Sequence, residues 1–228
     1  LRAVETALEK TPLVNEEDAF SLAQADEKDF LKYLYYVSAR RIKRLDEPKY
    51  KDLIKILFID DPEEAVREFN RYISVDENMV KLLRVFPVVA TTNISAYKLG
   101  EPKPYFDMVI MDEAGQCNTA VSLVPILRGK NLMLVGDPQQ LKPVVLLDPK
   151  DNKTLMDRYE IDPEYDYLKQ SVYEVFLARD PLSEEVLLSY HYRCHPKIIE
   201  FNNKKYYNGK LNIRTNNTQA EPLIYIEC

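Results

Sequence analysis

Two short polar strings in this chain each follow an apolar run that is typical of a β-strand. The first is residues 112–116 (DEAGQ), which follows the run at residues 106–111. The second is residues 136–141 (GDPQQL), which follows the run at residues 132–135. In a parallel sheet the carboxyl ends of the strands meet at one edge, where α/β proteins place phosphates and metal ions. The strings therefore predict an α/β fold with polar side chains gathered at one end of its sheet.

Apolar runs and helical patterns alternate through the second half of the chain. Further strands are expected at residues 88–92, 186–188 and 223–226. Helices are expected at residues 119–128, 171–179 and 196–207. Unbroken apolar strands that alternate with helices favour a parallel sheet buried on both faces.

The first 75 residues or so are predicted to be helical. Apolar and small side chains recur there at three- and four-residue spacing, at Leu31, Tyr35, Ser38, Ile42 and Leu45. Pro48 is expected to end this helix, because proline disrupts a helix interior. The next helix is expected to begin with Asp61 as its N-cap and Pro62 at its first position. A third is expected over residues 77–86, closed by Pro87.

Composition excludes several classes of protein. The chain has 228 residues, of which 46% are hydrophobic and 30% charged, and no apolar run approaches the ~18 residues that a membrane span needs. Its three cysteines, Cys117, Cys194 and Cys228, are too widely spaced for a disulfide framework or a zinc site. A cytoplasmic protein, or a nuclear one in a eukaryote, is expected. Because the chain opens on Leu1 rather than Met, we interpret it as a fragment.

The net charge of −6 does not by itself favour nucleic-acid binding, but its distribution leaves room for basic surfaces. Residues 32–55 hold eight basic and three acidic side chains, and residues 193–214 hold six basic and one acidic. A solvated helix face is the simpler explanation for the first cluster. A surface that binds nucleic acid or a protein partner is the alternative.

The carboxylate pair Asp112 and Glu113 has a structural and a catalytic interpretation. As a structural feature, it caps the next helix. As a catalytic one, Asp112 holds the magnesium ion that bridges the terminal phosphates of a nucleotide, and Glu113 orients and deprotonates the attacking water. A two-carboxylate metal nuclease is a third interpretation, although the additional acidic or histidine ligands of such sites are missing nearby.

The second string is compatible with a tight turn, since Gly136, Asp137 and Pro138 are turn-forming residues. That interpretation does not explain the glutamine pair before Leu141. A neutral amide at a strand tip can bind a phosphate oxygen or a water molecule without adding charge. Gln140 is therefore a candidate sensor of the γ-phosphate.

A third string, residues 190–196 (YHYRCHP), follows an expected strand and opens an expected helix at Pro196. Its simple interpretation is a loop with aromatic packing. Cys194 and His195 lack the neighbouring ligands that a metal site would need. Arg193 is more informative, because a permanently charged guanidinium from a second domain neutralises the charge that develops in phosphoryl transfer. Tyr192 beside it offers a ring on which a base can stack.

In this order the three strings resemble motifs II, III and IV of superfamily 1 helicases, in the branch of senataxin and the nonsense-mediated mRNA decay helicase. The resemblance covers about residues 85–215. It implies two RecA-like lobes with ATP in the cleft between them. On this pattern Asp112 and Glu113 are the magnesium and water residues and Gln140 is the coupling glutamine. Tyr192 becomes the adenine-stacking ring and Arg193 the arginine finger.

The resemblance also implies contacts with nucleic acid. Thr91, Thr92 and Ser95 lie where this branch has a motif that touches a single strand. Hydroxyl groups at a strand end suit contacts with phosphates, although threonine is also common in strands for its β propensity alone. Movement along single-stranded DNA or RNA from 5′ to 3′ is the implied activity.

The domain division that follows is a helical insertion at residues 1–75, the C-terminal part of a first RecA-like lobe at 76–184 and the beginning of a second at 185–228. A phosphate-binding loop of the form G-x-x-x-x-G-K-S/T is absent from the sequence. We therefore expect a central part of an ATP-dependent helicase, dependent on the rest of the helicase chain and without ATPase activity on its own. The alternative is a non-catalytic binding module that uses the basic helical block.

Overall fold

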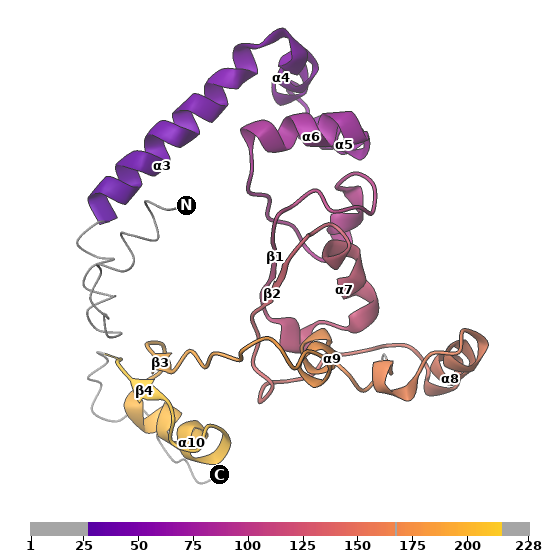
Figure 1. Cartoon of the computed structure of the whole chain (residues 1–228), viewed down its shortest axis with the longest axis vertical. Helices are drawn as coiled ribbons and strands as arrows, with labels where there is room; N and C mark the ends of the chain where they lie inside the picture. The colour runs from indigo at the N-terminus through magenta and orange to yellow at the C-terminus, as the bar shows by residue number, and fades with distance from the viewer. Residues whose placement is uncertain (1–26, 167, 216–228) are drawn as a thin grey trace, which may run out of the picture. The chain divides into compact units, whose positions relative to one another are not determined.

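The computed structural model describes residues 27–166 and 168–215 (Figure 1). Its contacts divide these residues into two compact units. The first unit runs to Asp107 and also takes in Leu127–Lys130, and the second takes in Met108–Ile126 and the residues from Asn131 onward. In the described part of the chain, no helix combines the length and the apolar character needed to cross a membrane.

The first unit is mainly helical, and the prediction of helices in the first 75 residues or so is confirmed for the described residues 27–75. Its α-helices are α3 (Glu27–Ile42), α4 (Lys51–Leu57), α5 (Pro62–Ser74) and α6 (Asp76–Val85), and its 3-10 turns are η1 (Lys43–Asp46), η2 (Pro48–Tyr50) and η3 (Ile94–Lys98). The predicted start of α5 is confirmed: the Asp61 carboxylate accepts a hydrogen bond from the Glu63 amide at 3.0 Å, and Pro62 is the first helical residue. The helix expected over residues 77–86 is confirmed as α6.

The core of the first unit lies between α4, α5 and α6. Its buried apolar side chains are Tyr50, Leu53, Tyr72, Ile73, Met79, Leu82, Val85 and Leu99. The buried Arg128 guanidinium fastens residues 127–130 to this unit, because it donates hydrogen bonds to the carbonyl oxygens of Leu99 at 3.0 Å and Gly100 at 3.1 Å. Charged donors are the stronger hydrogen-bonding groups, so this contact closes the turn at Gly100 firmly.

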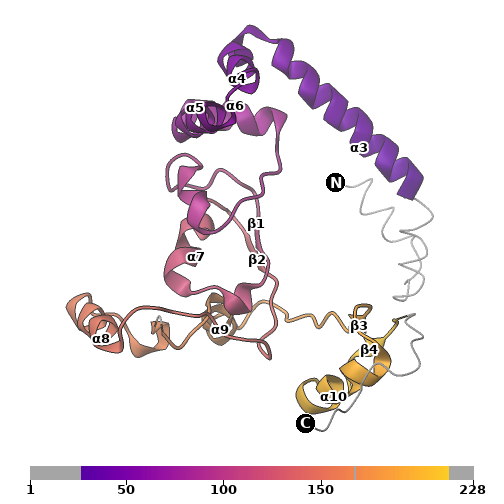
Figure 2. The same cartoon turned by 180° about the vertical axis from the view of Figure 1, so that it is seen from behind.

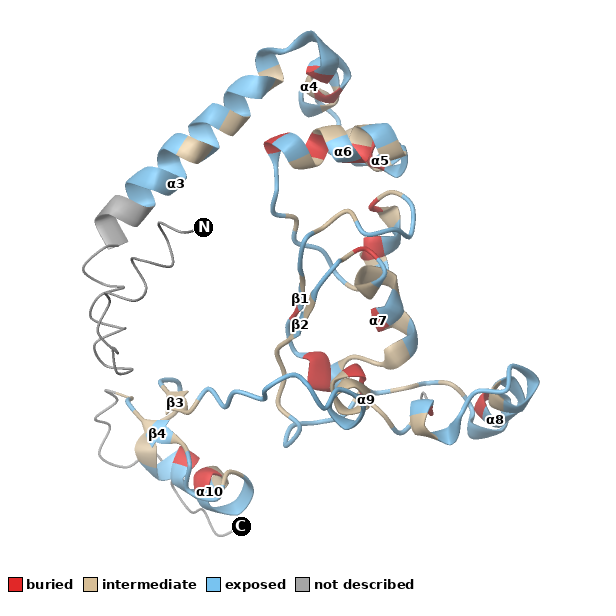
Figure 3. Cartoon of the chain, viewed as in Figure 1, coloured by how far each residue is buried: buried red, intermediate tan, exposed pale blue. Residues whose placement is uncertain are grey.

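Helix α3 differs from the prediction in two respects. It ends at Ile42, before Pro48, because the chain tightens into η1. There the side chains of Arg41 and Arg44 both donate to the Arg84 carbonyl oxygen. The expected apolar face is also exposed rather than buried, as Figure 3 shows, with Tyr35 70% exposed.

The second unit contains two short parallel sheets, which confirms an α/β fold. Strands β1 (Val109–Met111) and β2 (Leu132–Leu134) pair in parallel, with Ile110 opposite Met133. They lie side by side in both views (Figures 1 and 2). Strands β3 (Tyr190–His191) and β4 (Asn212–Ile213) form the second parallel pair. The other elements are η4 (Ala114–Gln116), α7 (Thr119–Ile126), α8 (Pro149–Arg158), η5 (Pro163–Tyr165), α9 (Val172–Arg179) and α10 (Pro196–Tyr206).

Helix α9 covers one face of the β1–β2 sheet. Val172 packs with Met111 and Ala114 in a buried cluster, and a capping box between Ser171 and Glu174 begins the helix. The opposite face is open. Ile110 is 62% exposed and Met133 is 47% exposed, so the prediction of a sheet buried on both faces is wrong for the described residues.

Two predicted strands are also wrong. Residues 88–92 and 186–188 contain β-branched or leucine side chains but have no pairing partner among the described residues. Val88 is 85% exposed and Leu188 is 77% exposed. A strand requires a neighbouring backbone, and an apolar run alone does not supply one. After the run at residues 186–188, strand pairing begins at Tyr190, which lies opposite Asn212. The strand expected at residues 223–226 lies outside the described residues.

Two buried hydroxyl groups in the first core lead to a stability prediction. The hydroxyls of Tyr50 and Tyr72 have no hydrogen-bond partner among the described residues. An unsatisfied buried hydroxyl costs ~1–3 kcal/mol, so we expect Tyr50→Phe to increase the free energy of unfolding by about 1 kcal/mol. Chemical denaturation measures this change in the free energy of unfolding. Leu53→Ala, at a neighbouring core position, is the control and should lose ~2–5 kcal/mol. A loss of stability in the Tyr50→Phe variant would contradict the prediction.

Candidate nucleotide site

The turn after β1 places two adjacent carboxylates at the end of the strand. It is fastened to β2, because the Ala114 amide donates to the Val135 carbonyl oxygen at 2.8 Å. Glu113 adopts a left-handed backbone with φ of 52°, which is uncommon for a residue with a side chain and follows from the sharp turn. Its amide donates to Asp112 Oδ1 at 2.9 Å. Both carboxylates are exposed, so they are available to a ligand.

The turns after β1 and β2 meet backbone to backbone at two glycines. A Cβ atom on Gly136 would lie 2.8 Å from the Gly115 nitrogen, and one on Gly115 would lie 3.0 Å from the Asp137 carbonyl oxygen. Contacts this short leave room only for hydrogen at these positions. The Tyr173 ring of α9 lies behind the contact, 3.2 Å from the same Cβ position on Gly136. The two sequence strings are thus joined in space, as predicted from the ends of parallel strands.

The Asp137 carboxylate organises the second turn. Its Oδ1 accepts from the Gln139 amide at 2.9 Å, and its Oδ2 accepts from Gln140 Nε2 at 3.1 Å. The side-chain amide of Gln140 is therefore held by its nitrogen, while its carbonyl oxygen makes no hydrogen bond with the described residues. The sequence predicted Asp137 only as a turn-forming residue. Its position three residues before Gln140 was the available signal for this contact.

Two half-buried tyrosines lie beside this turn. The Tyr207 hydroxyl donates to Asp137 Oδ2, and the Tyr173 hydroxyl donates to Glu185 Oε1 at 2.7 Å. Burial and the neighbouring carboxylate raise the pKa of each tyrosine to about 12. Burial on its own would raise the pKa of Asp137, but the hydrogen bonds from Tyr207, the Gln139 amide and Gln140 outweigh it and lower that pKa. Tyr207 was not predicted, because nothing local in the sequence links it to residue 137.

The segment between β3 and α10 presents Tyr192 and Arg193 to solvent. The Cys194 amide donates to His191 Nε2 at 2.8 Å, and the Lys197 amide donates to His195 Nδ1 at 3.2 Å. Both histidines thus shape the loop and the start of α10. Tyr192 is 65% exposed. The Arg193 guanidinium is exposed and makes no hydrogen bond or ion pair with the described residues.

The predicted site residues fall into two groups. Asp112, Glu113 and Gln140 lie on the two joined turns. Tyr192 and Arg193 lie on the loop before α10, and the hydrogen bond between Tyr207 and Asp137 links the far end of that helix to the second turn. That Arg193 faces the carboxylates across one crevice stays a prediction.

The residues proposed to touch nucleic acid belong to the first unit. Thr92 Oγ1 accepts from the Ser95 amide at 3.2 Å, which starts the turn η3. Thr91 and Thr92 are both exposed. They lie in an extended segment rather than at the end of a strand, so the predicted strand context is wrong, while their role stays a prediction.

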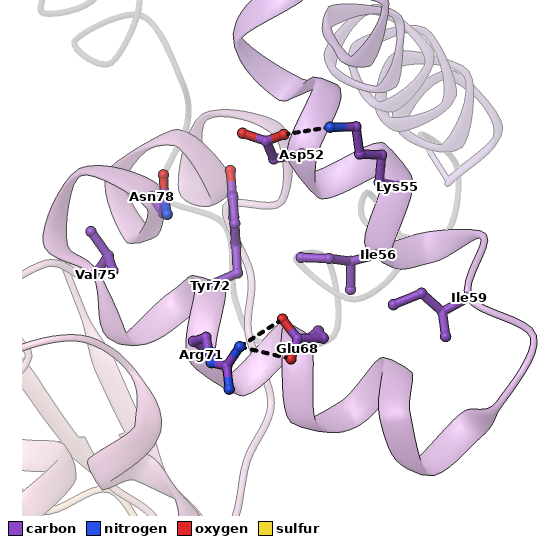
Figure 4. A pocket seen from close by; sticks show the side chains of 9 residues that line it. All are labelled: Asp52, Lys55, Ile56, Ile59, Glu68, Arg71, Tyr72, Val75 and Asn78. Carbon is purple, nitrogen blue, oxygen red and sulfur yellow. Dashed lines mark hydrogen bonds and ion pairs between the residues drawn. The ribbon is translucent and has the colours of Figure 1, made fainter.

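A cavity of about 470 Å³ lies between α4 and α5 in the first unit (Figure 4). Its rim carries the ion pair between Arg71 and Glu68, and the Tyr72 ring forms part of its wall. None of the predicted site residues is among those that line it. In the described ranges, no group of three or more histidine, cysteine or acidic side chains is arranged to hold a metal ion.

The chain is similar to a family of AAA domains and to several helicases. The family model of an AAA domain matches residues 46–147, a span that contains both joined turns. An uncharacterised ATP-dependent helicase of Methanocaldococcus jannaschii is 28% identical over 165 residues, which cover 72% of this chain and 22% of that protein. The helicase SEN1 of Saccharomyces cerevisiae is 36% identical over 107 residues, covering 46% of this chain and 4% of SEN1.

The ATP-dependent helicase upf1 of Schizosaccharomyces pombe is 33% identical over 134 residues, which cover 58% of this chain and 13% of that protein. With the three motifs in their order, these matches support a superfamily 1 helicase in the branch of Sen1 and Upf1. The chain spans between 4% and 22% of the length of these three relatives.

The glycine contact between the two turns can be tested by adding a methyl group. We expect Gly136→Ala to lower the free energy of unfolding by ~1–3 kcal/mol, because the new Cβ would meet the backbone of Gly115 and not a flexible side chain. Chemical denaturation with far-UV circular dichroism measures this. An unchanged midpoint would mean that the turns are not in contact as described.

Proposed function

We propose that this chain carries the hydrolytic residues of an ATP-dependent helicase that translocates on single-stranded nucleic acid. The observation that carries the proposal is the close contact of two polar turns at the carboxyl ends of β1 and β2. Such an edge is where α/β proteins bind nucleotides. The names of the relatives, which are ATP-dependent helicases, support the same conclusion.

The first turn suits a magnesium–phosphate complex. Magnesium is commonly held through one or two carboxylates together with phosphate oxygens, so the oxygen donors of Asp112 and Glu113 fit it without a larger ligand cluster. When bound, the ion supplies positive charge at the terminal phosphates. We assign Asp112 to the ion. Glu113 is assigned to orient the attacking water and to accept its proton.

The second turn suits a sensor of the γ-phosphate. Asp137 holds the nitrogen of the Gln140 amide at 3.1 Å, which leaves the Gln140 carbonyl oxygen to accept a hydrogen bond from the lytic water. A glutamine held in this way changes partners without a change of charge. This is the property that coupling of hydrolysis to a conformational step requires.

The loop before α10 supplies the remaining groups. Arg193 is proposed as the arginine finger, because its guanidinium is exposed and has no partner among the described residues. Tyr192 is proposed to stack on the adenine ring, since most of its surface is open to solvent. Hydrolysis would then require this loop to approach Asp112 and Glu113, so the rate of ATP hydrolysis would depend on closure of the two lobes.

Nucleic-acid binding is proposed at Thr91, Thr92 and Ser95, whose hydroxyls suit phosphate contacts. The substrate is single-stranded DNA or RNA. The sequence contains no phosphate-binding loop of the G-x-x-x-x-G-K-S/T form, so we propose that this chain alone is inactive and acts with further parts of a longer helicase, in the cytoplasm or nucleus.

Loss of the Arg193 guanidinium should abolish turnover. In the complete helicase we expect Arg193→Ala to lower the ATPase kcat by ~10³-fold or more, as for other arginine fingers, while nucleotide binding largely survives. Steady-state ATPase assays and a fluorescent nucleotide titration measure the two effects. Arg158→Ala, on the exposed end of α8, is the matched control and should be unaffected. Near-normal turnover in the Arg193→Ala variant would remove that residue from the mechanism.

A second candidate function rests on the exposed helix α3 and the turn η1. Arg40 and Lys43 are exposed there, on an element that also presents Tyr35 and Tyr36 to solvent. Basic side chains that follow exposed tyrosines along the chain suit single-stranded nucleic acid, through phosphate contacts and base stacking. A non-catalytic binding role for the helical block is therefore the alternative.

Salt dependence tests this alternative. We expect the chain to bind a fluorescent single strand with affinity that falls as salt rises, and Arg40→Ala with Lys43→Ala to reduce the slope of log affinity against log salt by ~1–2. Lys150→Ala with Lys153→Ala, on α8, is the control pair of equal charge. Absence of binding at low salt would dispose of the alternative.

A further inference from the structure

Tyr207 makes a hydrogen bond between segments that are distant in the sequence. Its hydroxyl donates to Asp137 Oδ2 across a separation of 70 residues. Burial and the carboxylate raise the pKa of Tyr207 to about 12, so the hydroxyl keeps its proton at neutral pH and remains a donor. The side chain is half-buried, whereas its neighbour Tyr206 is 42% exposed.

The oxygen atom that accepts from Tyr207 also accepts from Gln140. Asp137 Oδ2 accepts a hydrogen bond from Gln140 Nε2 at 3.1 Å, and the other carboxylate oxygen accepts one from the Gln139 amide. The two side chains therefore share one acceptor. If one donor is lost, more negative charge on that oxygen is available to the other donor. The preferred orientation of the remaining hydrogen bond then changes.

Tyr207 is held firmly at the end of α10. Its amide donates to the Asn203 carbonyl oxygen at 3.2 Å, and its carbonyl accepts from the Lys210 amide at 3.0 Å. The side chain of Asn203 in turn binds both backbone groups of Leu211, at 2.9 and 3.0 Å. A helix of 11 residues is a rod about 16 Å long. One end of this rod follows Arg193, and the other end carries Tyr207.

We propose that Tyr207 is a positioning residue for ATP hydrolysis, which acts through Asp137 to orient the side chain of Gln140. This inference rests on the proposed function. It connects the loop that carries Arg193 with the glutamine that senses the γ-phosphate, through one helix and one shared carboxylate oxygen. A displacement of α10 withdraws the hydroxyl from Asp137 and releases Gln140 from its orientation.

The test uses the complete helicase with Tyr207→Phe, which removes one hydroxyl and keeps the ring. We expect the single-strand-stimulated kcat to fall about tenfold while the KM for ATP changes less than about twofold, because the lost contact acts on the transition state and not on substrate binding. Tyr206→Phe is the matched control and should behave as the unmodified protein. Equal melting temperatures for the two variants exclude a general loss of structure.

A double-mutant cycle separates positioning through Asp137 from a role in packing. In an Asp137→Ala background, the further change Tyr207→Phe should alter kcat by less than about twofold, since its route to Gln140 is already removed. A tenfold loss that persists in that background overturns the inference. So does a Tyr207→Phe variant with unchanged kcat in an active enzyme. An unmodified protein without ATPase activity refutes the proposed function as well.

Discussion

The close approach of Gly115 and Gly136 is the contact on which the second unit depends. A parallel pair of three-residue strands contributes few hydrogen bonds, so it holds two turns in register only if something else joins their ends. The backbone contact does this, together with the hydrogen bond from the Ala114 amide to Val135. It also buries Ala114 beneath Val172 of α9. The left-handed backbone at Glu113 is the local cost of this arrangement, of order 1 kcal/mol or more.

The two joined turns combine a fixed backbone with exposed side chains. The backbone of both turns is fixed by buried groups, while the side chains of Asp112, Glu113 and Gln140 are exposed. A site built in this way holds its reactive atoms in place without enclosing them, so a ligand can enter before a second element closes over it. Asp137 has a different position. Its carboxylate accepts hydrogen bonds from the Gln139 amide, Gln140 and Tyr207, so it stabilises the turn and is less available to a ligand than the exposed carboxylates.

The sequence predicted those features that depend on neighbouring residues. The cap at Asp61, the helix that begins after Ser171 and the strand ends before residues 112 and 136 are local, and each appears as expected. The errors concern partners far along the chain. Residues 88–92 have β propensity but nothing to pair with among the described residues, and the strand near residue 186 begins four residues later because Asn212 lies opposite Tyr190. The bond between Tyr207 and Asp137 is the extreme case, since no spacing rule connects residues 70 positions apart.

A tyrosine at position 207 suits the proposed role of a contact that is made and broken. A lysine or arginine there would pair with Asp137 as a charged donor, and such hydrogen bonds are roughly twice as strong as those of neutral donors. It would also compete with Gln140 for the negative charge of the shared oxygen. A neutral hydroxyl leaves that charge available to the glutamine amide, and its removal exposes no unpaired cation. Tyr173, whose hydroxyl binds Glu185 beside the same turn, has the same property. Both bonds are thus made by neutral donors: Tyr207 ties the turn to the end of α10, and Tyr173 ties α9 to Glu185.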